Sequence, residues 1–224
     1  MHLSSYTMNY HSSQMKNIED QLFRTVKLNK QVGSDFLISS KYKDHREWWV
    51  LGHVTQLLKR NKWQFPKFAL KTNPPDPDFQ TFDDHHKKFK PIEILEVLAP
   101  KRIRGKEYIR NEFDKSFISD PWSIFLENLR KKFLKRYEAD CWLVVYHNVA
   151  VTRYSSSGFW HNIILANAEM WYRDENNRSF NLAKSPYEKI IVIQSDGKAA
   201  VSIYPTLEII EPERTPHGLT ISLY

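Results

Sequence analysis

Residues 91–98, Pro-Ile-Glu-Ile-Leu-Glu-Val-Leu, form an apolar run that contains two glutamates, Glu93 and Glu96. Such a run is typical of a strand inside a sheet that is covered on both faces. A carboxylate buried there is costly unless a cation, a proton or a metal ion accompanies it. The run therefore predicts a core strand in which a glutamate is accompanied by a cation, a proton or a metal ion.

The composition of the 224-residue chain favours one globular domain. Hydrophobic residues make up 41% of it, which is enough for a core, and charged residues make up 26%. The single cysteine and six glycines exclude a disulfide scaffold, a cysteine-rich zinc module and a collagen-like repeat. The longest apolar run, residues 141–146, is far shorter than the roughly 20 residues that cross a bilayer. Since residues 1–20 also lack the apolar stretch of a secretory signal, we expect a cytoplasmic protein without a membrane segment.

The chain is basic, with 33 Lys and Arg against 26 Asp and Glu, a formal net charge of +7. An excess of cations suits a polyanionic partner such as nucleic acid, although charge scattered for solubility gives the same total. The candidate nucleic-acid-binding residues are Arg102, Arg104, Arg130, Lys131 and Lys135. A solvated helix face is the alternative explanation for the last three.

The pattern along the chain predicts an α/β fold. We expect helices at residues 44–59, from Pro121 onward and at 159–172. We expect strands at residues 65–71, 79–82, 89–98, 141–146, 189–194, 200–205 and 207–210. This order predicts a mixed central sheet flanked by helices, with a C-terminal helix and β-hairpin. It forms a single domain over residues 18–224, after a flexible N-terminal arm at residues 1–17.

Glu47 lies on the apolar side of the first expected helix. At 100° per residue it shares a face with Leu51, Val54 and Leu58. Two interpretations remain open at this stage. Glu47 is three residues after Asp44, so it could complete a capping box and stay in water, or its carboxylate could point inward at a site.

Two acids on neighbouring strands predict a metal site. Asp78 begins one hairpin strand and Glu93 lies on the next, and paired strands are only about 5 Å apart. Carboxylates so placed can share one divalent cation, which activates water and stabilises charge on a phosphate. We therefore predict Asp78 and Glu93 as catalytic residues, and Glu47, Asp78 and Glu93 as ligands of Mg²⁺ or Mn²⁺.

This arrangement resembles the PD-(D/E)XK, or restriction-endonuclease-like, nuclease superfamily. The resemblance covers residues 44–150, through the acidic helix, Pro77-Asp78, the strand around Glu93, the helix from Pro121 and the strand 141–146. It implies an αβββαβ core, two metal-binding acids at Asp78 and Glu93, and a helical acid at Glu47. The implied activity is Mg²⁺-dependent hydrolysis of phosphodiester bonds in DNA, with RNA as a further substrate class.

The chain departs from the superfamily pattern at Leu95. The pattern places a lysine two residues after the second acid, where it positions or deprotonates the attacking water, and leucine cannot do this. Some members are understood to take the lysine from a neighbouring element. Four lysines are candidates here: Lys71, Lys101, Lys106 and Lys131. Glu96 is a poor substitute, since odd spacing along a strand directs it to the opposite face from Glu93.

Two other functions compete with a nuclease. A catalytically silent protein could keep the fold and bind nucleic acid, and Leu95 favours it. A protein-interaction domain is the third option, in which nearby lysines or arginines satisfy the acids.

We expect His85 and His86 to lie in a solvated turn and Cys141 to be a buried structural thiol. No heptad or other interface signal is present, although a homodimer would suit cleavage of both DNA strands.

Overall fold

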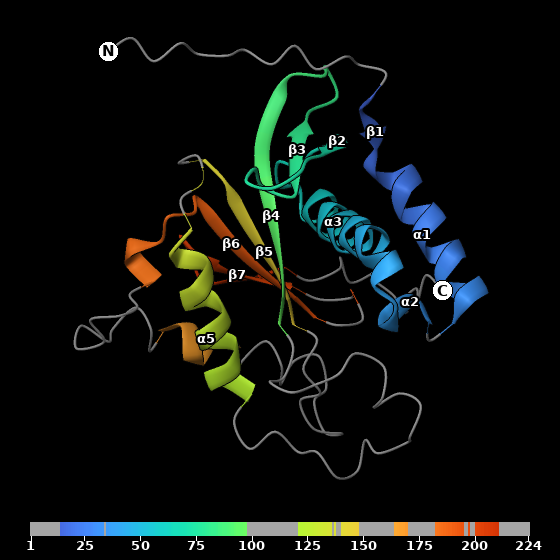
Figure 1. Ribbon diagram of the computed structural model, residues 1–224. Coiled ribbons are helices and arrows are strands. Elements are labelled where there is room, and N and C mark those ends of the chain that lie inside the picture. The colour runs from blue at the N-terminus through green and yellow to red at the C-terminus, as the bar shows by residue number, and fades with distance from the viewer. Residues whose placement is uncertain are drawn as a thin grey trace, which may run out of the picture.

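Strands form one sheet in the described part of the chain, with helices on either side of it (Figure 1). The computed structural model describes residues 14–33, 35–97, 121–135, 137, 140–147, 164–169, 182–194, 197 and 200–210. The helical elements are α1 (Ile18–Val32), α2 (Asp35–Ile38), η2 (Ser40–Tyr42), α3 (Lys43–Arg60), α5 (Pro121–Phe133) and η4 (Leu182–Lys184). The strands are β1 (Lys16–Asn17), β2 (Phe68–Lys71), β3 (Phe79–Phe82), β4 (Lys88–Val97), β5 (Trp142–His147), β6 (Lys189–Gln194), β7 (Ala200–Tyr204) and β8 (Glu208–Ile210).

The sheet follows the order of the chain, from β1 at one edge of the described strands to β8 at the other. Strands β1 to β4 pair antiparallel, β5 and β6 run parallel to β4, and β7 and β8 return antiparallel. The parallel pairs are joined by long connections, as parallel strands require. The predicted α/β class with a mixed sheet is confirmed, and α3, β2, β3, β4, α5 and β5 follow one another in the expected order.

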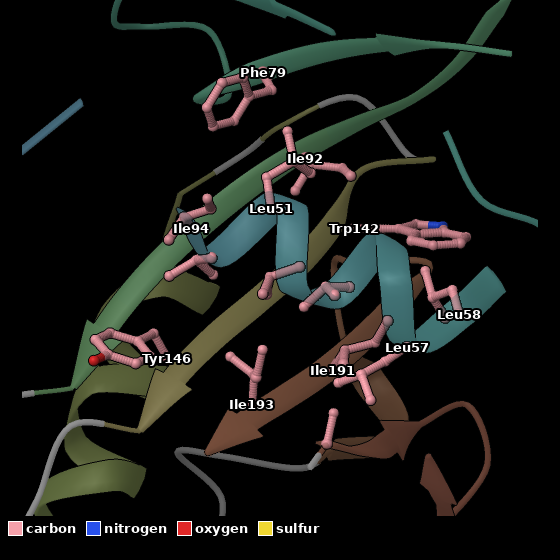
Figure 2. Packing of buried hydrophobic residues seen from close by; sticks show 14 of the residues in the cluster. Leu51, Leu57, Leu58, Phe79, Ile92, Ile94, Trp142, Tyr146, Ile191 and Ile193 are labelled. Atoms are coloured by element: carbon pink, nitrogen blue, oxygen red, sulfur yellow. The ribbon is translucent and has the colours of Figure 1, made fainter. Parts of the chain in front are cut away.

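Each face of the sheet carries its own apolar cluster. Alternation along β5 directs Leu143 and Val145 toward α5, and Val144 toward α3. Figure 2 shows Leu51 and Leu58 of α3 turned toward the strands on their side. Both leucines are almost fully buried, and each such side chain contributes about 1.5–3 kcal/mol to folding. The result is a three-layer arrangement in which α3 and α5 cover opposite faces.

Helix α3 begins differently from the sequence prediction. Its first residue is Lys43, and its N-cap, Tyr42, makes no side-chain capping bond. Asp44 lies within the first turn, where its negative charge suits the positive end of the helix. The capping-box interpretation of Glu47 is wrong, because its carboxylate contacts lysines and the residue is only 8% exposed. The inward orientation of Glu47 is the correct alternative.

The amino-terminal region contains a helix that the sequence reasoning missed. Residues 16–17 of the predicted arm pair with β2, and Asn17 caps α1 by accepting a hydrogen bond from the Asp20 amide at 3.2 Å. Helix α1 packs on α3, where Leu22 meets Gly52 so closely that an added Cβ would lie 2.6 Å from Leu22 Cβ. The rest of the arm, residues 1–13, lies outside the described residues.

The later elements agree with the predicted strands. Strands β6, β7 and β8 occupy the expected hairpin and the expected final strand, and β5 matches the buried run that starts near Cys141. Of the helix predicted at residues 159–172, only residues 164–169 are described, and they are helical. Within the described ranges, none of the helices combines the length and the apolar character that a bilayer crossing needs.

Candidate active site

An open pocket of about 610 Å³ lies where β3 and β4 separate. The pairing of these strands ends at Phe79 and Ile92, while β4 continues to Val97 beside β5. The residues just beyond this last pair, Asp78 and Glu93, both line the pocket. The strand separation therefore gives the two predicted acids a shared open space.

The pocket walls come from both sides of the sheet. Helix α3 and the loop before β3 supply Lys43, Arg46, Glu47, Val50, Pro74, Pro75 and Asp76. Strands β4 and β5 supply Ile94, Leu95, Glu96 and Tyr146 beside the two acids. The region of α5 supplies Lys132, Lys135 and Tyr137. Five carboxylates and four cationic side chains line this space, so the pocket has mixed charge within a basic chain.

Glu47 reaches the site from α3 and is held by two lysines. Its Oε2 accepts a hydrogen bond from the Lys71 ammonium, and its Oε1 lies 3.4 Å from Lys43 Nζ. Its side chain is 10% exposed, so water screens these ion pairs only partly. The adjacent carboxylate raises the pKa of Lys43 above its ordinary value. Two lysine side chains therefore hold the helical acid within the site.

Asp78 connects the helix side of the site to the strand side. Its Oδ1 lies 3.4 Å from Lys71 Nζ, and its Oδ2 accepts a hydrogen bond of 2.8 Å from the Ile94 amide. The backbone amide of Asp78 donates to Glu93 Oε2 at 3.2 Å. Backbone groups thus hold the two strand acids next to each other.

Glu93 is the most buried of the three acids, with 5% of its side chain exposed. Its Oε1 accepts a hydrogen bond from Lys132 and lies 3.9 Å from Lys135 Nζ. The Tyr137 hydroxyl also hydrogen-bonds to Glu93. Burial, with Glu93 nearby, raises the pKa of Tyr137 well above its ordinary value, so the phenol stays protonated as a donor.

The three predicted metal ligands thus border one pocket, but they belong to two ion-pair groups. Glu47 and Asp78 share Lys71, whereas Glu93 pairs with Lys132. Neighbouring residues of a strand point to opposite faces of the sheet, and Ile94 faces α3, so Glu93 faces the other side. The two ion-pair groups therefore approach the pocket from different faces. Asp78 joins the two groups through its contact with Glu93.

The donor set suits a hard cation. Mg²⁺ prefers oxygen ligands and is commonly bound by one or two carboxylates, with water and substrate phosphate completing its shell. Asp78 and Glu93 both line the pocket, and the Asp78 backbone amide donates to the Glu93 carboxylate. Among the residues that the structure describes, no three His, Cys, Asp or Glu side chains are grouped as they would be around a bound metal ion. The described structure therefore does not group the three predicted ligands as one metal cage, and the metal site stays a prediction.

Leu95 is explained by its packing. It lies on the face of β4 covered by α5 and is buried in a cluster with Phe125 and Leu129. A lysine there would lose this contact and bring an ammonium under the helix. The next turn of α5 carries Lys132, which reaches Glu93 instead.

The four candidate replacement lysines have different places. Lys71 reaches two of the acids and lies over the Phe79 ring, with its Nζ 4.6 Å from the ring centroid. Lys131 is exposed and pairs with Glu127 four residues before it. Lys101 and Lys106 lie outside the described residues. Of the two candidates that the structure describes, Lys71 is the one beside the acids.

The predicted nucleic-acid-binding residues are also divided. Lys135 lines the pocket, and Lys131 lies on the solvent side of α5. Arg130 is partly buried on the same helix. Arg102 and Arg104 fall in a segment that the structure does not describe. The basic flank of α5 thus contributes to the pocket mainly near its carboxyl end.

Sequence reasoning did not assign to the site three side chains that contact its acids: Lys43, Lys132 and Tyr137. Lys43 is four residues before Glu47, a helical spacing that places the two side chains together. Lys132 is three residues after Leu129, so the apolar stripe of α5 could have placed it near the acids. Nothing in the sequence indicates that Tyr137, which follows the helix, turns back to Glu93.

The structure also places the other side chains that were considered for a chemical role. His85 and His86 are exposed, and the His86 ring packs on Phe68. Cys141 is a fully buried free thiol, as predicted. Glu96 borders the pocket, although strand alternation directs it to the face opposite Glu93.

Comparisons with protein families, with curated proteins and with solved structures found no match to this chain. Functional inference therefore depends on the geometry of the pocket.

Proposed function

We propose that this chain is a nuclease that uses Mg²⁺ or Mn²⁺ to hydrolyse phosphodiester bonds in nucleic acid, with DNA as the expected substrate. The proposal includes a restriction-endonuclease-like core over residues 44–150. The observation that supports it is that Asp78 and Glu93 line one pocket at the strand separation, where the Asp78 backbone amide donates to the Glu93 carboxylate and lysines lie nearby. An antiparallel β2–β3–β4 unit followed by a helix and a parallel strand agrees with that core.

Each residue has a definite part in the proposed reaction. Asp78 and Glu93 hold the metal ion, which when bound makes water a better nucleophile and stabilises charge on the leaving oxygen. Glu47 fixes the Lys71 ammonium beside Asp78. Lys71 is the described candidate for the lysine that is missing at position 95, and it holds Glu47 and Asp78 from outside the pocket lining. The basic side chains of the pocket offset the charge of the substrate phosphates.

Cleavage assays test this function directly. Purified protein is incubated with plasmid and single-stranded DNA, with Mg²⁺ or Mn²⁺ and separately with chelator. Asp78→Asn and Glu93→Gln should each lower metal-dependent cleavage on the order of a hundredfold or more, since bound metal supplies several kcal/mol of stabilisation to the transition state. Glu127→Gln is the matched control, because Glu127 pairs with Lys131 on the solvent side of α5.

Leu95 favours a second function, binding of nucleic acid without cleavage. In that case the protein retains salt-sensitive DNA binding, and no cleavage occurs with either metal ion. Cleavage that persists unchanged in both acid variants would instead exclude the proposed site. Thermal unfolding of each variant separates loss of function from loss of the fold.

A further inference from the structure

Glu93 already has a positively charged partner in the described structure. Lys132 donates to its Oε1, and only 14% of the Lys132 side chain is exposed. The other carboxylate oxygen, Oε2, accepts from the Asp78 amide. A cation that binds Glu93 through Oε1 must therefore occupy the space near the lysine ammonium, and the two positive charges repel each other.

The two lysines beside the acids are held to different degrees. Lys71 contacts both Glu47 and Asp78 and also lies over the Phe79 ring, and it is not among the residues that line the pocket. Lys132 lines the pocket and is paired with Glu93. Lys71 is therefore fixed among several groups, whereas Lys132 has open space next to it.

The backbone of Lys132 is anchored, so only its side chain needs to move. The hydroxyl of Tyr187, a buried residue, donates to the Lys132 carbonyl at 3.2 Å, and the Lys135 amide donates to the same oxygen at 3.0 Å. A lysine side chain has four flexible carbons, and its ammonium can turn on them while the helix remains in place.

We propose that Lys132 is an internal counter-ion of Glu93 that a divalent cation displaces, and that the freed ammonium then binds a phosphate group of the substrate. This rests on the proposed function and describes how the same site is regulated. In the metal-free protein Lys132 neutralises the buried carboxylate. When the metal ion binds, it neutralises Glu93 in place of Lys132 and leaves the Lys132 ammonium facing the pocket. An anionic substrate therefore binds more tightly to the metal-bound protein than to the metal-free protein.

Direct Mn²⁺ binding tests the first half of this proposal without any cleavage. Mn²⁺ is titrated at pH 8 into wild type, Lys132→Met and Lys131→Met, and free Mn²⁺ is followed by electron paramagnetic resonance. Lys132→Met should bind Mn²⁺ about tenfold more tightly than wild type, which corresponds to about 1.4 kcal/mol. Lys131→Met is the matched control on the solvent side of α5 and should bind as wild type does. Lys132→Gln serves as the second variant if methionine prevents folding.

Oligonucleotide binding tests the second half. A short fluorescent single-stranded DNA is titrated in the presence of Ca²⁺, and its anisotropy is measured. Lys132→Met should bind this DNA several-fold more weakly than wild type, although it binds Mn²⁺ more tightly. Lys132→Arg retains the charge and should restore DNA binding.

The outcomes separate this inference from the proposed function. Equal or weaker Mn²⁺ binding by both neutral variants overturns the displacement of Lys132, even if wild type cleaves DNA. Undiminished DNA binding by Lys132→Met overturns the phosphate contact. Tighter Mn²⁺ binding by the variants without any cleavage by wild type supports the displacement and refutes the nuclease. A wild-type protein that binds no Mn²⁺ refutes both.

Discussion

Lys71→Met tests whether the acids are held together in solution as the structure has them. Methionine keeps much of the lysine stem but removes the ammonium that contacts Glu47 and Asp78. Two carboxylates are then left close together without this cation, in a place where Glu47 is largely shielded from water. We expect the variant to fold and to be less stable than wild type.

The size of the effect follows from the exposure of the three groups. Their side chains are 10% exposed for Glu47, 20% for Asp78 and 25% for Lys71. Exposed ion pairs contribute about 0–1 kcal/mol, whereas breaking a fully buried pair costs about 3–5 kcal/mol. This site lies between those limits, and Lys43 remains near Glu47 as a partial substitute. We expect a loss of about 2 kcal/mol in the free energy of unfolding, or a midpoint about 4–8 °C lower.

Urea unfolding at pH 8, followed by tryptophan fluorescence, measures this loss. The matched control is Lys59→Met, because Lys59 also pairs with a glutamate, Glu19, and also approaches an aromatic ring, Phe65. That pair is about half exposed on both sides, so its removal should change stability by less than about 1 kcal/mol. If Lys71→Met costs no more than Lys59→Met, the three groups are not packed together in solution.

Two further variants test other parts of the structure. The pKa values of Tyr137 and Tyr187 are raised by burial, so both phenols keep their protons in the folded state at pH values where the unfolded chain loses them. The stability that comes from these protonated phenols is fully present below pH 10. Above pH 10 the free energy of unfolding falls by up to about 1.4 kcal/mol per pH unit for each tyrosine. Urea unfolding at pH 8, 10 and 11 should show a smaller decline for Tyr137→Phe than for wild type, and equal declines would contradict the raised pKa. Gly52→Ala should lower the thermal midpoint, because the new Cβ would lie 2.6 Å from Leu22 Cβ. Overpacking of this kind costs about 1–3 kcal/mol, which exceeds the roughly 1 kcal/mol gained in helix propensity. An unchanged or higher midpoint would mean that α1 packs less closely on α3.

The sequence predicted the structure best where apolar residues recur along a strand or helix at the period of that element. Strand β5 and the β6–β7 hairpin were predictable because their residues are apolar on both faces and end at turn residues. Helical geometry placed Glu47 on the apolar face of α3, although the sequence left a capping role open beside the inward orientation. These predictions succeeded because local periodicity and tertiary packing favour the same structure.

Other features depend on contacts that local patterns do not contain. Helix α1 has only three buried residues, Ile18, Leu22 and Thr25, so its packing against α3 decides its structure. The capping-box prediction at Asp44 was wrong because Glu47 has nearby lysines as partners, which satisfy it better than a backbone amide. The pairing of Lys132 with Glu93 joins residues 39 positions apart and depends on how α5 crosses the sheet.

The chain order of the strands has a consequence for the growing polypeptide. The described residues that line the pocket lie between Lys43 and Tyr146, and β6 to β8 extend the sheet beyond β5. The ribosome has therefore synthesised these lining residues before it reaches the strands β6 to β8. Those strands then cover the free edge of β5 and complete both apolar clusters, so strands β6 to β8 stabilise a centre whose residues were made earlier.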